Sequence, residues 1–366
     1  MAYDSLPPPR RFEPQFHGNR TMKLRTTLSL IALSTFLVFP TILRAEESKR
    51  EIAIQGRTMG TTYHVKVVSE TPDLGDLARR IEARLAEINR SMSTYDPESE
   101  ISRFNRTVPA NAPFPISGDF LEVMAMGLRL HRITDGAWDA TVNPLVNLWG
   151  FGSRSDGYRI PSDEEIAAVL PVVGFQHIGI SQDGFLVKRI PGVSLDLGSI
   201  AKGYGVDQVA RVVAAAGYRD YIVEIGGEIY AAGRRPDGER WRIGISRPSP
   251  GGAPEDIYRV ASLENRGFAT SGDYRNFFVA DGTRHSHVID PRTGKAVANR
   301  VVAASVVAET AAFADGLATA LMVMDPEKGL EAVNRLDGVE CLVVVEGPAG
   351  ELADHASEGF PEVAMP

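Results

Sequence analysis

The feature that most constrains the fold is an apolar stretch at residues 308–325, AETAAFADGLATALMVMD. Its composition predicts a helix whose apolar residues occupy almost every face. They are Ala311, Ala312, Ala314, Leu317, Ala318, Leu321, Met322 and Met324. A helix that is apolar all round belongs in the interior of a protein, so other elements must surround it. With 366 residues the chain is long enough to bury one large core or two moderate ones.

One acid interrupts this helix. Asp315 and Thr319 are four residues apart and therefore share a helix face. A buried carboxylate is costly unless a cation, a metal ion or hydrogen-bond donors meet it. Taken alone, the pattern favours a capping or solvent-facing Asp beside an incidental Thr. The rest of the chain favours the alternative, in which the carboxylate and the hydroxyl together face a ligand.

The bulk composition excludes some classes of protein. The chain is 43% hydrophobic and 23% charged, which is ordinary for a globular protein. Its formal net charge of -8 argues against a nucleic-acid partner, because a phosphate-binding surface needs clustered excess cation. The single cysteine, Cys341, can form neither an internal disulfide nor a CxxC-type metal site. It lies in an apolar run, where core packing is the expected role.

The N-terminus predicts a targeting segment. Residues 1–21 are rich in Pro and Arg, and we expect a disordered tail or a mis-called extension there. Residues 22–45 have a basic start, an apolar run of about twelve residues and a small residue at the end, which is typical of a secretory signal. Such a run is too short for a comfortable membrane span. No cysteine follows it, so we do not expect a lipid anchor, although an uncleaved anchor stays open.

Helices and strands alternate without a strict βαβ rhythm, which predicts an α+β fold. Alternating Tyr63, Val65 and Val67 predict a strand at 61–68, and apolar residues at helical spacing predict a helix at 76–91. The other expected helices are 120–134, 162–170, 198–216 and 326–336. The other expected strands are 185–187, 192–196, 241–245, 277–281, 285–290, 301–307 and 339–346, with two more in 221–232 that pivot on Gly226 and Gly227. We expect a turn of small residues at 267–274 and a loose tail at 347–366.

Residues 194–207, SLDLGSIAKGYGVD, predict a strand that passes through a Gly turn into a helix. Free N–H groups at the start of that helix and the ammonium of Lys202 suit a phosphate group. The pattern is common in α/β units, and a solvated Lys is the alternative. Residues 136–152 are too rich in Gly, Pro and Asn for a regular element and too apolar for a solvated loop, so we expect them to wrap a ligand or to be held in a core.

His285 and His287 share one side of an expected strand, but no further His or Cys cluster supports a zinc site.

Several segments, in this order and spacing, resemble the ApbE family of FAD:protein FMN transferases. They are MGTTY at 59–63, STY at 93–95, SEISRFN at 99–105, GAWDATVNPLVNLWGFG at 136–152, LDLGSIAKGYGVD at 195–207, EIGGEIYAAG at 224–233, ATSGDY at 269–274, HVIDPRTG at 287–294 and ADGLATAL at 314–321. The resemblance places a flavin transferase domain at 50–346. It implies ApbE-like, T-fold-related mixed sheets with packed helices and an FAD cleft between two subdomains.

The resemblance also implies an activity, which is Mg2+-dependent transfer of the FMN half of FAD to a Thr hydroxyl of a target protein, with release of AMP. Family targets are flavoprotein subunits of membrane redox complexes, of the Na+-translocating quinone reductase (Na+-NQR) and Rnf types. The family acts in the periplasm, at or near the inner membrane, which agrees with the secretory signal. An FAD pyrophosphatase that yields FMN and AMP, and a non-catalytic periplasmic flavin-binding protein, are the alternatives.

Carried over residue by residue, the family pattern implies a set of site residues. The implied metal ligands are Asp315, Thr319 and Ser199, the last through its side chain or its backbone carbonyl. The implied contacts to the flavin nucleotide are Met59, Tyr95, Ala137, Trp138, Asp139, Asp196, Lys202 and Ile289. Tyr95 offers a flat face for stacking, with a core Tyr as the alternative.

A Thr hydroxyl is a poor nucleophile and needs a base. We hypothesise that His287 is that base, because the pKa of an imidazole lies near operating pH. The alternative is a structural His that bonds the turn at Asp290.

Overall fold

The interior of the protein is organised around α7 (Ala311–Val323), which confirms the helix expected from the apolar stretch. All of its residues except Thr319 are buried. Thr310 caps the helix, because its side chain accepts a hydrogen bond from the N–H of Phe313. The preceding strand, β13 (Val301–Ala308), is buried at every residue.

The computed structural model describes residues 49–107, 109–152, 157–249, 256–273, 277–280 and 283–364. They belong to one compact unit, Glu47–Pro366. The expected tail at 1–21 and the expected signal at 22–45 lie outside the described residues. Within the described part of the chain, no helix has both the length and the apolar character needed to cross a membrane.

The main sheet has eight antiparallel strands in the order β1-β2-β6-β7-β10-β13-β14-β15. Its strands besides β13 are β1 (Arg50–Thr58), β2 (Thr61–Ser69), β6 (Tyr221–Ile225), β7 (Glu228–Ala232), β10 (Arg266–Gly272), β14 (Glu340–Glu346) and β15 (Leu352–Ala356). The centre of the sheet therefore joins strands from the middle and the end of the chain. The expected α+β class is confirmed.

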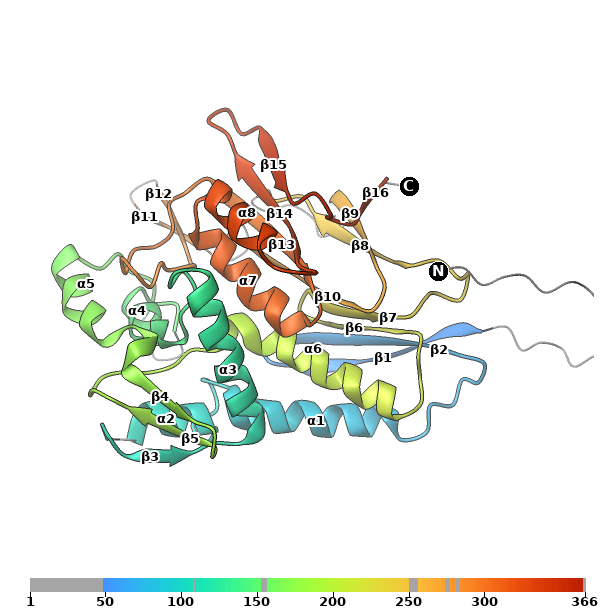
Figure 1. The fold of residues 1–366 in the computed structure, drawn as a ribbon, viewed down its shortest axis with the longest axis horizontal. Coiled ribbons are helices and arrows are strands. Elements are labelled where there is room, and N and C mark those ends of the chain that lie inside the picture. The colour runs from blue at the N-terminus through green and yellow to red at the C-terminus, as the bar shows by residue number, and fades with distance from the viewer. Residues whose placement is uncertain are drawn as a thin grey trace, which may run out of the picture. The chain divides into compact units, whose positions relative to one another are not determined.

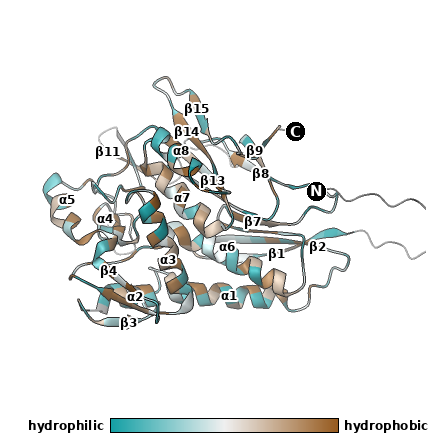
Figure 2. Cartoon of the chain, in the orientation of Figure 1, coloured by the Kyte–Doolittle hydropathy of each residue, from teal (hydrophilic) through white to brown (hydrophobic). Residues whose placement is uncertain are grey.

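Each face of this sheet is covered. Helix α7 packs on β10 and β13, and α6 (Gly198–Ala215) packs on β6, β7 and α7 (Figure 1). Helix α1 (Leu77–Met92) packs on α6 and buries Leu77, Ile81, Leu85 and Ile88, as its sequence predicts. On the other face lies a sheet in the order β16-β9-β8, formed by β8 (Trp241–Ser246), β9 (Ile257–Leu263) and β16 (Glu362–Val363). Figure 2 shows that hydrophilic residues recur along α1, whereas α7 carries almost none.

The remaining helices and strands lie outside the main sheet (Figure 1). The helices are α2 (Glu100–Thr107), α3 (Gly118–Ile133), α4 (Asn143–Leu148), α5 (Asp163–Val169) and α8 (Pro326–Asn334), with 3-10 turns η1 (Ala140–Val142), η2 (Leu170–Val172) and η3 (Phe175–His177). The strands are β3 (Pro113–Pro115), β4 (Ile178–Ser181) and β5 (Phe185–Lys188), which form one sheet, and the hairpin β11 (Phe277–Ala280) with β12 (Thr283–Ser286).

Three expectations are wrong, and a fourth is partly wrong because the strand expected at 285–290 ends at Ser286, so that His287 does not share it with His285. Residues 192–196 are not a strand, because the side chain of Asn105 takes both backbone hydrogen-bonding groups of Leu195, at 2.7 and 2.8 Å. Residues 267–274 are not a turn, since they begin as strand β10. The small residues there have a packing reason, because a Cβ on Gly267 would lie 2.7 Å from the Cα of Ala311.

The third wrong expectation is the loose tail at 347–366. That segment contains β15, which pairs with β14 along the edge of the main sheet, and β16, which pairs with β9. Polar side chains on β15 conceal its strand character, because an edge strand has an exposed face.

The close approach of α6 and α7 yields a stability prediction. A Cβ on Gly203 would lie 2.6 Å from the carbonyl carbon of Ala311 and 2.7 Å from the Cα of Ala312, and both are backbone atoms. Gly203→Ala is therefore expected to lower the free energy of unfolding by about 1–3 kcal/mol or more. Urea denaturation measures this loss.

Gly118→Ala is the matched control, because nothing lies within 4 Å of a Cβ there and the residue begins a helix. It is expected to change the free energy of unfolding by no more than about 0.5 kcal/mol. Equal effects of the two substitutions would contradict the packing argument.

Candidate active site

A cleft of about 1030 Å³ opens beside the buried helix. It is bounded by the start of α6, the turn between β6 and β7, the ends of β8 and β10, and one face of α7. Residues of the segments 142–152 and 287–289 complete its wall. This size suits a small-molecule or cofactor site.

The cleft brings together nine of the twelve site residues expected from the sequence. They are Met59, Tyr95, Asp196, Ser199, Lys202, His287, Ile289, Asp315 and Thr319. Ala137, Trp138 and Asp139 are buried and do not line it.

Three charged side chains meet at the base of the cleft. The ammonium nitrogen Nζ of Lys202, on α6, lies 2.8 Å from Oε1 of Glu228 and 3.6 Å from Oδ1 of Asp315. Both carboxylates are buried, with Asp315 2% and Glu228 4% exposed, whereas the Lys202 side chain keeps 30% of its surface accessible. The other Asp315 oxygen, Oδ2, accepts a hydrogen bond from the N–H of Gly203 at 3.1 Å.

Burial controls the protonation of this group. Burial raises the pKa of Asp315, and the nearby Lys202 ammonium opposes this. Burial likewise raises the pKa of Glu228, again opposed by Lys202. Burial alone would lower the pKa of Lys202, but the two carboxylates raise it above its ordinary value, so the ammonium stays charged.

The sequence did not point to Glu228. It is the first residue of β7, directly after a turn in which Gly226 (φ +60) and Gly227 (φ +106) are left-handed. In the sequence, the feature that could have indicated Glu228 is an acid directly after a Gly-Gly turn in the segment 224–233. Its Oε2 atom is buried and has no hydrogen-bond partner within the described part of the chain.

Thr319 lies one turn after Asp315 on the same face of α7, as its spacing predicts. Its hydroxyl donates to the backbone carbonyl of Asp315 at 3.2 Å and is 3.1 Å from the hydroxyl oxygen of Ser271 on β10. The Thr319 oxygen therefore lies among other neutral oxygens close to the carboxylate.

Ser199 is held by a side chain from behind the cleft. Its Oγ atom accepts a hydrogen bond from the indole Nε1–H of Trp138 at 2.9 Å. Trp138 is 2% exposed, and its ring fills the space left by the missing side chain of Gly127. Trp138 thus positions the turn at the start of α6.

Both carboxylate oxygens of Asp139 accept hydrogen bonds from other residues of the protein. Its Oδ1 atom accepts hydrogen bonds from the N–H and hydroxyl of Thr141, and its Oδ2 atom accepts one from the N–H of Phe175 at 3.0 Å. The Nδ1 atom of His131 is 3.1 Å from Oδ2. The hydrogen bond to Asp139 is the main reason that the pKa of His131 is raised, with burial opposing it. The expected contact of residues 137–139 with a nucleotide stays a prediction.

The rim of the cleft carries an aromatic ring and an imidazole. Tyr95 is 78% exposed, so the alternative of a core Tyr is wrong. His287 follows β12 directly, and its ring lies 6.3 Å from that of Phe151, edge to face. Met59 adopts a left-handed conformation (φ +49) at the turn between β1 and β2, and Ile289 is 5% exposed.

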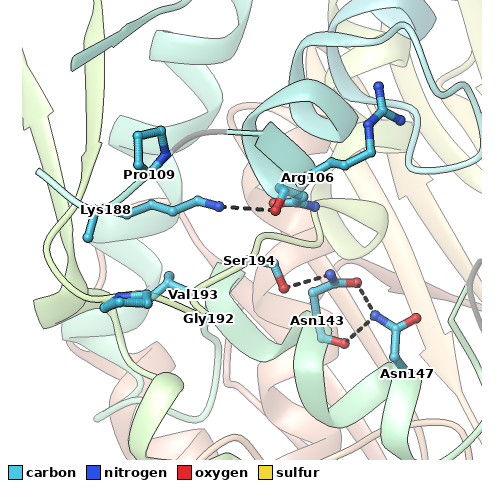
Figure 3. A pocket seen from close by; sticks show the side chains of 11 residues that line it. Arg106, Pro109, Asn143, Asn147, Lys188, Gly192, Val193 and Ser194 are labelled. Carbon is cyan, nitrogen blue, oxygen red and sulfur yellow. Dashed lines mark hydrogen bonds between the residues drawn. The ribbon is translucent and has the colours of Figure 1, made fainter. Parts of the chain in front are cut away.

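A second pocket, of about 330 Å³, lies on the other side of α4 (Figure 3). Asn143 and Asn147 line it, whereas Val142 and Val146 line the larger cleft. The ammonium of Lys188 crosses this pocket and donates to the carbonyl oxygen of Asn105 at 3.1 Å. None of the site residues expected from the sequence lines it.

The fold is that of flavin transferases. The solved structure titled Flavin Transferase ApbE from Vibrio cholerae has a TM-score of 0.77 and 40% sequence identity, over 85% of this chain and 98% of that one. The apo form of the Pseudomonas stutzeri flavinyl transferase ApbE has a TM-score of 0.76 and 40% identity, over 85% and 95%.

The chain belongs to the ApbE family, whose model matches residues 59–343. A relative from Vibrio cholerae serotype O1, named FAD:protein FMN transferase, is 41% identical over 334 residues, or 90% of this chain and 97% of that protein. One of the same name from Haemophilus influenzae is 41% identical over 296 residues, which cover 79% and 85%. The resemblance found in the sequence is confirmed.

The contacts of Asp139 yield a prediction. Asp139→Asn is expected to lower the free energy of unfolding by about 1–3 kcal/mol, because an amide cannot accept all of these hydrogen bonds. A His whose pKa is raised in the folded state stabilises the fold below its ordinary value of 6.5, and this contribution is lost as pH rises through the folded pKa. The loss on substitution should therefore be largest near pH 6 and shrink toward pH 8.

Urea denaturation across that range measures the loss, and NMR titration should show the pKa of His131 falling. Asp183→Asn, at an exposed position, serves as the control and should change stability by no more than about 0.5 kcal/mol. A loss that is independent of pH would contradict the His131–Asp139 pairing.

Proposed function

We propose that this chain is an FAD:protein FMN transferase, which moves the FMN half of FAD to a Thr hydroxyl of an acceptor protein and releases AMP. The observation that carries the proposal is the buried Asp315 carboxylate, which lies in a nucleotide-sized cleft beside Lys202. A passive flavin carrier has no need of an acid buried at the base of its cleft, where burial is costly. Family membership and the names of the relatives support the same activity.

The proposed reaction exchanges one phosphorus–oxygen bond for another. The Thr oxygen bonds to the phosphorus of the FMN half, the bond from that phosphorus to the AMP oxygen breaks, and AMP leaves. The accessible ammonium of Lys202 is placed to pair with the diphosphate. His287 is the proposed acceptor of the Thr proton, and Tyr95 at the rim offers a face for stacking on a flavin or adenine ring.

The donor set suits a Mg2+ ion. Within the described ranges no group of three or more His, Cys, Asp or Glu side chains is arranged to hold a metal. Asp315, Thr319 and the Ser199 turn would therefore supply a few hard oxygens, with water and substrate phosphate as the other ligands, which is the coordination that Mg2+ prefers. When bound, the ion would neutralise the charge that develops on the diphosphate.

We further propose that the chain acts in the periplasm on flavoprotein subunits of membrane redox complexes, of the Na+-NQR or Rnf type. The secretory pattern at 22–45 supports this compartment. Detection of the mature protein in a periplasmic extract, without residues 22–45, tests it.

Substitution of Asp315 tests the proposed metal ligand. Asp315→Asn is expected to lower kcat/KM for transfer by about 100-fold or more, since it removes the anionic ligand that would hold the cation against the diphosphate. The measurement is flavin fluorescence on an acceptor protein after incubation with FAD and Mg2+. Full transfer by Asp315→Asn would contradict the assignment of Asp315 as a metal ligand.

The same incubation distinguishes transferase from pyrophosphatase. Covalent flavin on the acceptor appears only for the transferase, whereas free FMN and AMP without labelled acceptor indicate hydrolysis. A Thr→Val acceptor is the control for the site of attachment.

A separate prediction concerns His287. If it is the base, His287→Ala should lower the rate of transfer by about 100- to 10,000-fold and leave the Kd for FAD nearly unchanged. Stopped-flow rates at saturating FAD, together with fluorescence titration, give both numbers. Near-normal transfer would eliminate this role and leave a structural His.

A further inference from the structure

The role of Glu228 is open, although its carboxylate is closer to Lys202 than Asp315 is. The 2.8 Å contact to Glu228 is a hydrogen-bonded ion pair, whereas the 3.6 Å separation from Asp315 exceeds hydrogen-bond length. The structure therefore assigns the ammonium mainly to Glu228. Asp315 lines the cleft, and within the described part of the chain its Oδ1 atom has no hydrogen-bond donor closer than the Lys202 ammonium at 3.6 Å.

The net charge of the cluster explains why the pairing of Lys202 with Glu228, and not with Asp315, matters. When both carboxylates are ionised, they and the one ammonium leave a net charge of about -1 in a buried site. Without Glu228, Asp315 would be the one remaining counter-ion of the ammonium among the residues that the structure describes, and the pair would be neutral. A cation that approached Asp315 would then have to displace Lys202, and like charges a few ångströms apart repel strongly in a low-dielectric interior.

The backbone holds Glu228 in place for this contact. Glu228 pairs with Ile225 across the turn between β6 and β7. The turn requires a glycine at Gly226, because the residue is left-handed (φ +60) and a Cβ there would lie 2.8 Å from the Cγ2 of Thr61. The second Glu228 oxygen, Oε2, is buried and unpartnered among the described residues, so it holds no other element.

We propose that Glu228 is a positioning residue, which binds the ammonium of Lys202 so that Asp315 can take a divalent cation while Lys202 stays in the cleft for the diphosphate. This proposal rests on the proposed function, because it deepens the role of the same site. Glu228 acts through Lys202 and is not itself a ligand of the cation.

A double-mutant cycle on cation binding tests the proposal. Mn2+ is the probe, because it binds carboxylate and carbonyl sites as Mg2+ does and its free form has a measurable EPR signal. In the full chain, Glu228→Gln is expected to raise the Kd for Mn2+ about 10-fold, since Lys202 then turns to Asp315. In the Lys202→Met background the same substitution should change the Kd less than about 2-fold, because no ammonium is left to displace.

Glu224→Gln is the matched control. Glu224 lies in the same hairpin, but its carboxylate is partly exposed and bonds His64 and the N–H of Gly227. It should leave the Kd for Mn2+ unchanged. Glu228→Asp, which shortens the side chain by one methylene, should fall between the wild type and Glu228→Gln, and a thermal melt of each variant confirms folding.

The change in Mn2+ affinity in the two backgrounds distinguishes a positioning role of Glu228 from direct ligation. An equal loss of Mn2+ affinity in both backgrounds would overturn the proposal in favour of direct ligation by Glu228, and no loss in either would overturn it outright. Wild-type protein that binds no Mn2+ would overturn both the proposal and the metal assignment. The predicted pattern without any transfer to an acceptor would support the proposal and count against the transferase.

Discussion

The site depends on how closely α6 and α7 approach each other at Gly203. The missing side chain there lets the backbone of α6 touch Ala311 and Ala312, and it lets the N–H of Gly203 reach the carboxylate of Asp315. Four residues further along α6, Asp207 accepts hydrogen bonds from the N–H groups of Ala311 and Ala312 at 2.8 and 2.9 Å. The contact between α6 and α7 thus packs the core. It also supplies hydrogen-bond partners for the N–H groups at the start of α7 and for the buried carboxylate of Asp315.

The layered architecture turns this contact into a cleft. Helices cover one face of the main sheet and the small sheet covers the other, and the cleft lies where the starts of α6 and β7 and the end of β10 meet one face of α7. Lys202 and the two carboxylates can persist there because each charge has a partner. The apolar surroundings then strengthen every electrostatic contact to a bound diphosphate.

Much of this arrangement could be predicted from the sequence. The apolar stretch gave α7 and its buried position, and helical spacing gave the shared face of Asp315 and Thr319. The Gly turn before Lys202 gave the start of α6. These features are local, so a single segment carries the whole signal.

The rest depends on contacts between distant segments. Gly267 and Ala269 look like a turn until the packing of α7 on β10 is known, and Leu195 looks like a strand residue until Asn105 takes its backbone groups. The sequence does not reveal the role of Glu228, because its partner Lys202 lies 26 positions earlier in the chain. The hydrogen bonds and the ion pair that His131, Thr141 and Phe175 make to the carboxylate of Asp139 also depend on the fold, and a family pattern does not reveal them.

The position of α7 along the chain has a consequence for biosynthesis. Asp315 and Thr319 come from the last helix but one, and β14, which pairs with the strand β13 on which α7 packs, is made later still. A growing chain that already holds Lys202 and Glu228 lacks the acid that completes the cluster, and non-local pairings of this kind form late in folding. Chains truncated before α7 would therefore lack the acid of the cluster, so the site is complete only when synthesis has passed α7.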